Sequence, residues 1–235
     1  MKVVSADFVT SASAGSAIPR DGLPSFDRQL RAALRGLEGP QVALAGRSNV
    51  GKSSLINALT RRKIARTSAA PGKTRLVNLY RIELEGVPRP GPGPAPRRGS
   101  GQAAGPGRIA LYLVDLPGYG YARGGADAAA ELKAVAEAYF SSYGGPGALL
   151  LVDSRHPGLD ADIQAARWLG SVGVETRIVA TKIDKLTRSE RARNLKAIGD
   201  TFGTAAQPVS ATSGEGLDEL WRTIVTIARD ADRDG

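Results

Sequence analysis

The sequence predicts an α/β domain in which a mostly parallel six-stranded sheet carries helices on both faces. Two observations predict this fold. Short apolar segments alternate with segments of helical periodicity through most of the chain, and such alternation is typical of parallel strands connected by helices. The chain has 235 residues, a length that fits one domain. Because open sheets of this kind bind ligands beyond the carboxyl ends of their strands, we expect functional residues to follow the strands.

The predicted elements follow one another in regular order after residue 40. Strands are expected in the apolar or alternating segments 42–45, 76–85, 109–114, 148–152, 177–180 and 207–209. Helices are expected in the amphipathic or Ala-rich segments 53–59, 127–140, 160–170, 188–200 and 217–230. The alternation within 76–85 is typical of a half-exposed strand at the edge of a sheet.

Two segments stand outside this order. Residues 1–38 are expected to form an N-terminal leader, poorly structured over 1–24 and carrying a short amphipathic helix at 25–37, before a folded domain at 39–230. Residues 86–108 contain 13 Gly or Pro, four Arg and no acidic residue. This composition buries little apolar area, so we expect a disordered insertion in a hairpin loop.

Composition narrows the class of protein. The excess of 32 Lys and Arg over 23 Asp and Glu gives a net charge of +9, which favours a polyanion such as RNA as a partner. A bias in base composition toward Arg codons would also raise the charge. The chain has no cysteine and no apolar run of about 18 residues, so neither a disulfide framework nor a membrane span is expected. We expect a cytoplasmic monomer.

A phosphate-binding loop is predicted between the first buried strand and the helix after it. Its members are Gly46, Arg47, Ser48, Asn49, Val50, Gly51, Lys52 and Ser53, which match the pattern G-x-x-x-x-G-K-[ST]. The glycines let the backbone curl so that its N–H groups point at phosphate oxygens, and the helix adds its positive end. Lys52 is expected to reach the β- and γ-phosphates, and the Ser53 hydroxyl to ligate Mg²⁺.

A second motif selects the base. Thr181, Lys182, Ile183 and Asp184 directly follow the strand at 177–180. A carboxylate there can accept hydrogen bonds from both N1–H and the amine of guanine, and adenine offers neither donor in that arrangement. Lys182 is expected to lay its aliphatic stem over the base. Backbone N–H groups after the strand at 207–209 are expected to meet the guanine O6 from Val209, Ser210 and Ala211. The expected ligands are therefore GTP and GDP.

Two further loops are expected to respond to the γ-phosphate. Asp115, Leu116, Pro117 and Gly118 end the strand at 109–114, where the carboxylate would hold Mg²⁺ through water and the glycine N–H would sense the phosphate. Thr74 is expected to supply a second Mg²⁺ ligand from the segment Gly72, Lys73, Thr74, Arg75 and Leu76. The catalytic set is then Lys52, Thr74 and Gly118. This order of motifs predicts a Ras-like P-loop GTPase.

Five segments together closely resemble the EngB family of GTP-binding proteins, also called YihA or YsxC. They are GRSNVGKSSLINAL, PGKTR, VDLPGYGYA, VDSRHPGLDADIQAARWL and ATKIDKL, within a resemblance that covers roughly residues 40–225. The resemblance implies a ribosome-biogenesis GTPase that acts on the large ribosomal subunit and is linked to normal cell division and septation. It places nucleotide contacts at 46–53, 72–76, 115–118, 181–184 and 209–211, with Mg²⁺ on Ser53 and Thr74. The 86–108 insertion and the Ser68-Ala69-Ala70 segment depart from the family pattern.

The sequence leaves open which group replaces the catalytic glutamine of Ras-like enzymes and which supplies positive charge at the phosphates. Tyr119 stands where Ras-like enzymes carry the glutamine that orients water, so we expect slow hydrolysis that a ribosomal partner stimulates. Asn49 occupies the position at which GTPases resembling MnmE ligate K⁺; alternatively it only stabilises the loop. The single histidine, His156, is expected to make structural or partner contacts rather than to act in catalysis.

The role of the protein also has an alternative. A non-enzymatic switch, in which GTP gates docking to RNA or the ribosome and hydrolysis is incidental, would carry the same motifs. In either case a basic run is expected to face ribosomal RNA: Arg61, Arg62, Lys63, Arg66, Lys73 and Arg75. Alternatively, these residues form only a solvated, Arg-rich face.

Overall fold

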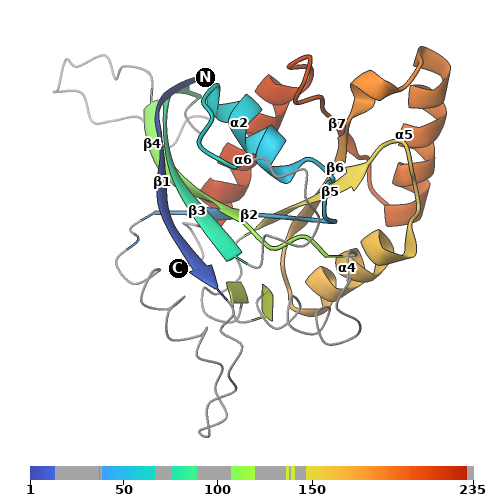
Figure 1. Cartoon of the computed structure of the whole chain (residues 1–235), viewed down its shortest axis with the longest axis horizontal. Coiled ribbons are helices and arrows are strands. Elements are labelled where there is room, and N and C mark those ends of the chain that lie inside the picture. Colours follow the sequence, from blue (N-terminus) through green and yellow to red (C-terminus); the bar gives the residue numbers. More distant parts are fainter. Residues whose placement is uncertain are drawn as a thin grey trace, which may run out of the picture.

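Seven strands form one mixed, mostly parallel sheet in the order β1-β3-β4-β2-β5-β6-β7 (Figure 1). The computed structural model describes residues 1–13, 37, 39–66, 76–88, 107–119, 136–137, 139–140 and 147–231. The strands are β1 (Lys2–Ser13), β2 (Gln41–Gly46), β3 (Leu76–Val87), β4 (Gly107–Asp115), β5 (Ala148–Asp153), β6 (Thr176–Thr181) and β7 (Gln207–Pro208). All six predicted strands are confirmed, but the count of six for the whole sheet is wrong.

The additional strand is the N-terminal segment, which was expected to be poorly structured. β1 pairs antiparallel with β3 from Lys2 opposite Glu85 to Ser13 opposite Leu76. Its pattern is weak because Ala6 is the one buried side chain among residues 1–11, the part of the strand whose burial is described, and the pairing depends mainly on backbone hydrogen bonds with a strand over 60 residues away. β3 therefore lies inside the sheet, between β1 and β4, rather than at the edge. The helix expected at 25–37 lies outside the described residues, apart from residue 37.

Helices cover both faces of the sheet, as predicted. They are α2 (Lys52–Thr60), α4 (Asp160–Ser171), α5 (Arg188–Phe202) and α6 (Leu217–Ala231), with a one-turn 3-10 helix η1 at Ile183–Lys185. Residues from α2 and α6 pack with one set of strand side chains, and residues from α4 and α5 pack with the set on the opposite face. Of the helix expected at 127–140, only 136, 137, 139 and 140 are described, and all four are helical.

The central strands are buried on both faces, which explains their continuous apolar sequences. Every residue of β2 and of β5 is buried, and alternate side chains such as Ala43 and Leu44 enter the two opposite cores. The indole N–H of Trp221 in α6 donates to the Leu59 carbonyl at 3.1 Å. That bond satisfies a carbonyl in the last turn of α2, so α6 fixes the helix that begins at the phosphate-binding loop.

The strand register brings the ends of several strands to one edge. Leu44 lies opposite Asp115, Gly46 opposite Leu151, and Asp153 opposite Thr181. At the other end of β4, Gly107 pairs with Val87 of β3, so both ends of the predicted 86–108 insertion lie in strands, and residues 89–106 lie outside the described ones. Among the described residues, no helix is long and apolar enough to cross a membrane.

Candidate functional site

The loop between β2 and α2 has the backbone that the phosphate-binding pattern requires. Gly51 has φ 113° and Asn49 has φ 63°, both in the left-handed region that Gly and Asn tolerate best. A Cβ on Gly46 would lie 2.8 Å from Val50 Cγ1 and 3.0 Å from the Leu151 carbonyl oxygen, so a larger residue does not fit. The loop therefore curls against the end of β5, and α2 begins at Lys52.

Lys52 lies at the closed end of this loop. Its Nζ donates to the Gly46 carbonyl at 3.2 Å, within the loop itself. Burial lowers the pKa of Lys52, and the nearby Asp115 carboxylate partly opposes that shift. A Cβ on Gly118 would come within 3.0 Å of Nζ, so the turn after β4 lies directly against the ammonium group.

Asp115 and Ser53 form a donor set suited to a hard cation. The Ser53 hydroxyl donates to Asp115 Oδ2 at 3.4 Å, while Oδ1 is buried without a hydrogen-bond partner among the described residues. Burial raises the pKa of Asp115, and Lys52 and Ser53 act in the opposite direction. A buried carboxylate oxygen with no partner, next to a hydroxyl, fits the oxygen ligands of Mg²⁺. Thr74, the other predicted ligand, lies outside the described residues together with Gly72, Lys73 and Arg75.

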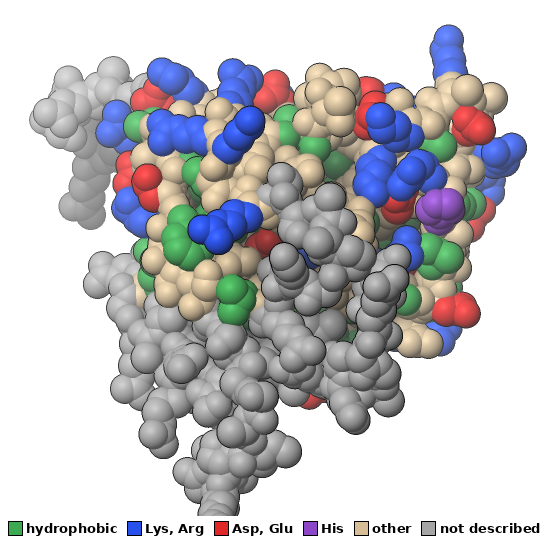
Figure 2. Space-filling model, viewed as in Figure 1, with side chains coloured by type: hydrophobic (Ala, Val, Ile, Leu, Met, Phe, Trp, Pro, Cys, Tyr) green, Lys and Arg blue, Asp and Glu red, His purple; other side chains and the backbone are tan. Residues whose placement is uncertain are grey.

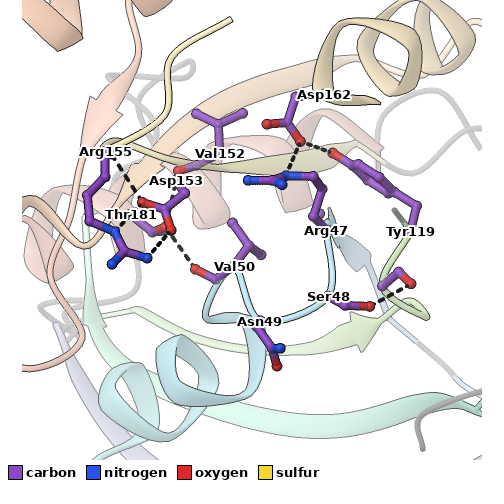
Figure 3. Close-up of polar contacts among 12 residues, drawn as sticks. Arg47, Ser48, Asn49, Val50, Tyr119, Val152, Asp153, Arg155, Asp162 and Thr181 are labelled. Carbon is purple, nitrogen blue, oxygen red and sulfur yellow. Dashed lines mark hydrogen bonds and ion pairs between the residues drawn. The ribbon is translucent and has the colours of Figure 1, made fainter. Parts of the chain in front are cut away.

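Residues at the end of β6 hold the loop from its other side (Figure 3). The Thr181 hydroxyl lies 2.9 Å from the Val50 carbonyl and 3.1 Å from the Val152 carbonyl. Lys182 Nζ donates to the Asn49 carbonyl at 2.7 Å and to Asp153 Oδ2 at 2.9 Å. The threonine and the lysine of the predicted base-selecting motif thus fasten the phosphate-binding loop to β5 and β6.

Asp184 is oriented by the loop after β7. The Ser210 hydroxyl donates to Asp184 Oδ1 at 2.7 Å and accepts from the N–H groups of Thr212 and Ser213 at 3.2 and 3.0 Å. Those two N–H groups occupy the lone pairs of the hydroxyl, which directs its proton to the carboxylate. The Ser210 hydrogen bond, with Lys185 nearby, lowers the pKa of Asp184, so the carboxylate is an acceptor at neutral pH.

The described members of the predicted site come together at the carboxyl edge of the sheet. They are Gly46–Ser53, Asp115–Gly118, Thr181–Asp184 and Val209–Ala211. Leu76 begins β3 two residues before Asn78, which pairs with Asp115, so it lies at the same edge. The Arg47 side chain turns away toward Asp162, 3.3 Å from its Nε, which leaves its backbone as the group available to a phosphate.

Three residues that the sequence analysis singled out, apart from the nucleotide motifs or for a further role, are Asn49, His156 and Tyr119. The Asn49 side chain makes no hydrogen bond to a described residue, so the prediction of a K⁺ ligand is not tested. His156 is exposed, and its backbone N–H donates to the Asp153 carbonyl at 2.9 Å in the turn after β5. The Tyr119 hydroxyl donates to Asp162 Oδ1 at 3.0 Å, so its polar end is engaged by α4.

Sequence reasoning missed two carboxylates, Asp153 and Asp162. Burial by itself raises the pKa of Asp153, but hydrogen bonds from Arg155, at 2.9 and 2.7 Å, and from Lys182 hold it well below its usual range. Asp162 lies in the first turn of α4 with both Arg47 and Tyr119 beside it. Both lie in the VDSRHPGLDADIQAARWL segment of the family resemblance, but no motif gave either of them a role; Asp153 carried a further signal, because it ends a buried strand as Asp115 does.

Comparison with known proteins gives a consistent assignment. A model of the family described as "50S ribosome-binding GTPase" matches residues 41–182. A "Probable GTP-binding protein EngB" of Symbiobacterium thermophilum is 40% identical over 94% of this chain and 94% of its own length. One of the same name from Alkaliphilus metalliredigens is 36% identical over 97% of this chain and 92% of its own length.

Solved structures agree on the fold. The crystal structure of a probable GTP-binding protein engB superposes with a TM-score of 0.56 at 21% identity, covering 81% of this chain and 99% of that one. Aquifex aeolicus Era bound to GDP.AlF4- gives a TM-score of 0.56 at 23% identity, covering 80% of this chain and 56% of that one.

The ion pairs of Asp153 generate a prediction on stability. Asp153→Asn removes the charge that Arg155 and Lys182 hold, and we expect it to lower the free energy of unfolding by about 2 kcal/mol at pH 7. Because the folded-state pKa lies below the unfolded value, this stabilisation is present above about pH 4 and is lost as the pH falls through the folded pKa. Urea unfolding of both proteins at pH 7, 5 and 3 measures it.

The matched control is Glu219→Gln, which alters an exposed carboxylate 3.4 Å from Arg222 and should change stability by under about 1 kcal/mol at any pH. A difference between wild type and Asp153→Asn that is as large at pH 3 as at pH 7 would contradict the assignment.

Proposed function

This chain belongs to the EngB family of GTP-binding proteins and is a GTPase, and we propose that it acts in assembly of the large ribosomal subunit. Its slow hydrolysis of GTP would be stimulated by a ribosomal partner. The description of the matching family as a ribosome-binding GTPase supports the partner, and the net charge of +9 suits an RNA surface. We extend the proposal to the family's link with normal cell division and septation, in a cytoplasmic monomer.

The observation that carries guanine recognition is the hydrogen bond from Ser210 to Asp184. This hydrogen bond fixes the position of one carboxylate oxygen and lowers the pKa of Asp184, so the group stays charged. A charged carboxylate is the acceptor that the N1–H and the amine of guanine need. We propose that residues 46–53 bind the phosphates through their backbone and that Lys52 exchanges its bond with Gly46 for the β- and γ-phosphates.

We place Mg²⁺ on Ser53 and Thr74, with Asp115 acting through a water. The unpartnered Asp115 Oδ1 supports this position. Bound there, the ion would neutralise phosphate charge and orient the γ-phosphate. Lys52 and the Gly118 N–H complete the proposed catalytic set. Because Tyr119 stands where Ras-like enzymes carry the water-orienting glutamine and has no amide group, it cannot act as that glutamine does, which supports slow intrinsic turnover.

Replacing Asp184 tests the base assignment. In Asp184→Asn, the carboxamide cannot accept from both guanine donors, and we expect GTP and GDP binding to weaken at least about tenfold. The amide N–H of the new side chain pairs with the added carbonyl of xanthine, so xanthine nucleotides should bind better than guanine nucleotides. Titrations with GDP, XDP and ADP measure the preference. Equal affinity of the wild type for ADP and GDP would refute the guanine site.

Measurement of GTP hydrolysis distinguishes a GTPase from a GTP-gated switch in which hydrolysis is incidental. The same measurement tests whether K⁺ activates hydrolysis. We expect single-turnover GTP hydrolysis to be slow alone, faster with large ribosomal subunits, and faster in KCl than in matched NaCl if Asn49 ligates K⁺. Asn49→Gly keeps the left-handed backbone at φ 63° and removes only the side chain, so it should abolish the difference between the salts. Equal rates in both salts, with and without subunits, would rule potassium out. Absence of stimulation by subunits would favour the switch.

The basic run after α2 is the proposed RNA contact. Arg61, Arg62 and Lys63 are exposed, although one Arg62 nitrogen also donates to the Val4 carbonyl at 3.3 Å. Figure 2 shows Lys and Arg side chains gathered along the edge where Figure 1 has α2 and the N-terminus. Arg66 is exposed as well, and Lys73 and Arg75 lie outside the described residues.

Charge reversal tests this surface. We expect Arg61→Glu with Lys63→Glu to weaken binding to large subunits and to flatten its dependence on salt, because fewer phosphate contacts release fewer counterions. Arg167→Glu with Lys196→Glu is the control, since it makes the same change of charge at exposed positions of α4 and α5. Sedimentation with subunits across a KCl series measures both. Equal loss in the two double variants would mean that net charge, and not this surface, governs docking.

A further inference from the structure

Asp162 is a buried acid for which the nucleotide motifs give no role. Its side chain is 1% exposed, and its carboxylate lies 3.3 Å from Arg47 Nε and accepts from the Tyr119 hydroxyl at 3.0 Å (Figure 3). Burying a charge is costly unless it is paired, so this carboxylate depends on those two side chains. Burial raises the pKa of Tyr119, which keeps its hydroxyl protonated as the donor.

The two partners come from the two loops that meet where the γ-phosphate is expected. Arg47 belongs to the phosphate-binding loop, and Tyr119 follows Gly118 directly. The same loops are joined by backbone: the Ser48 N–H donates to the Tyr119 carbonyl at 2.9 Å, and the Ser48 hydroxyl donates to the Gly118 carbonyl at 3.1 Å. Asp162 therefore bridges, from α4, two loops that already contact each other.

This closed arrangement leaves little space between the loops. A Cβ on Gly118 would lie 2.8 Å from the Ser48 nitrogen and 3.0 Å from Lys52 Nζ. A γ-phosphate at the position expected between Lys52 and the Gly118 N–H would need more room than one methyl group, so the turn at 118–119 would have to move away from Ser48 for GTP to bind. GDP lacks that phosphate and makes no such demand.

We propose that Asp162 is a positioning residue that holds the turn at 118–119 against the phosphate-binding loop through Tyr119 and Arg47, and thereby favours GDP over GTP. The proposal rests on the nucleotide site proposed above. The carboxylate touches neither nucleotide; it acts on the turn, and GTP binds only at the cost of weakening these contacts. Releasing the turn should therefore strengthen GTP binding relative to GDP.

The test compares affinities for GDP and for a non-hydrolysable GTP analogue, measured by displacement of a fluorescent guanine nucleotide. Tyr119→Phe removes only the hydroxyl, and Asp162→Ala removes the acceptor together with its buried charge. We expect each to raise the affinity for the analogue relative to GDP by about tenfold or more, the value of one hydrogen bond to a charged group. The double variant should show no change beyond that of Asp162→Ala, because Asp162→Ala already removes the contact with the Tyr119 hydroxyl.

Asp160→Ala is the control, since it removes an exposed acid from the same first turn of α4 and should leave the ratio of affinities unchanged. If Asp162→Ala does not fold, Tyr119→Phe decides alone. An unchanged ratio, an equal shift for both nucleotides, or additive effects in the double variant would overturn the proposal. A wild type that binds neither nucleotide would instead refute the proposed nucleotide site, so the two failures are distinguishable.

Discussion

Two side chains, Thr181 at the end of β6 and Lys182 directly after it, hold the carboxyl ends of β2, β5 and β6 together. The site depends on this fastening. The Thr181 hydroxyl lies between the carbonyls of Val50 and Val152, and the Lys182 ammonium group lies between the Asn49 carbonyl and Asp153. A buried carbonyl such as that of Val50 needs a donor, and the Thr181 hydroxyl supplies it. The phosphate-binding loop is therefore fixed from the base-binding side, by residues of the motif expected to read the base.

Around this fastening, three buried carboxylates each face a cation from another segment. Asp115 lies near Lys52, Asp153 is paired with Arg155 and Lys182, and Asp162 is paired with Arg47. Each pairing joins the phosphate-binding loop, or a residue that holds it, to a different strand or helix. Because loss of one partner would leave an unpaired buried charge, each pair makes the position of the loop depend on the segment that carries the carboxylate.

The central fold could be predicted because its signals are local. β2 and β5 are continuous apolar runs, and α6 carries Leu220, Trp221 and Ile224 at helical spacing, so periodicity suffices. β1 could not be found this way, because its side chains bury little and its partner is distant. The same reason hid Asp162, which is 43 residues from Tyr119 along the chain, a pairing that exists only after the sheet brings β4 and α4 together. The motif residues were predicted because their backbone geometry is encoded in consecutive residues.

Thr181→Val tests the fastening most directly, since it keeps the shape of the side chain and removes only the hydroxyl. The measurement is amide hydrogen exchange of residues 46–53 in the nucleotide-free protein, wild type against variant. We predict faster exchange in this loop in Thr181→Val, because the Val50 carbonyl loses its donor, with unchanged exchange in α6, whose described residues make no hydrogen bond to Thr181. Equal exchange of the loop in both proteins would contradict the view that Thr181 holds the phosphate-binding loop in place before nucleotide binds.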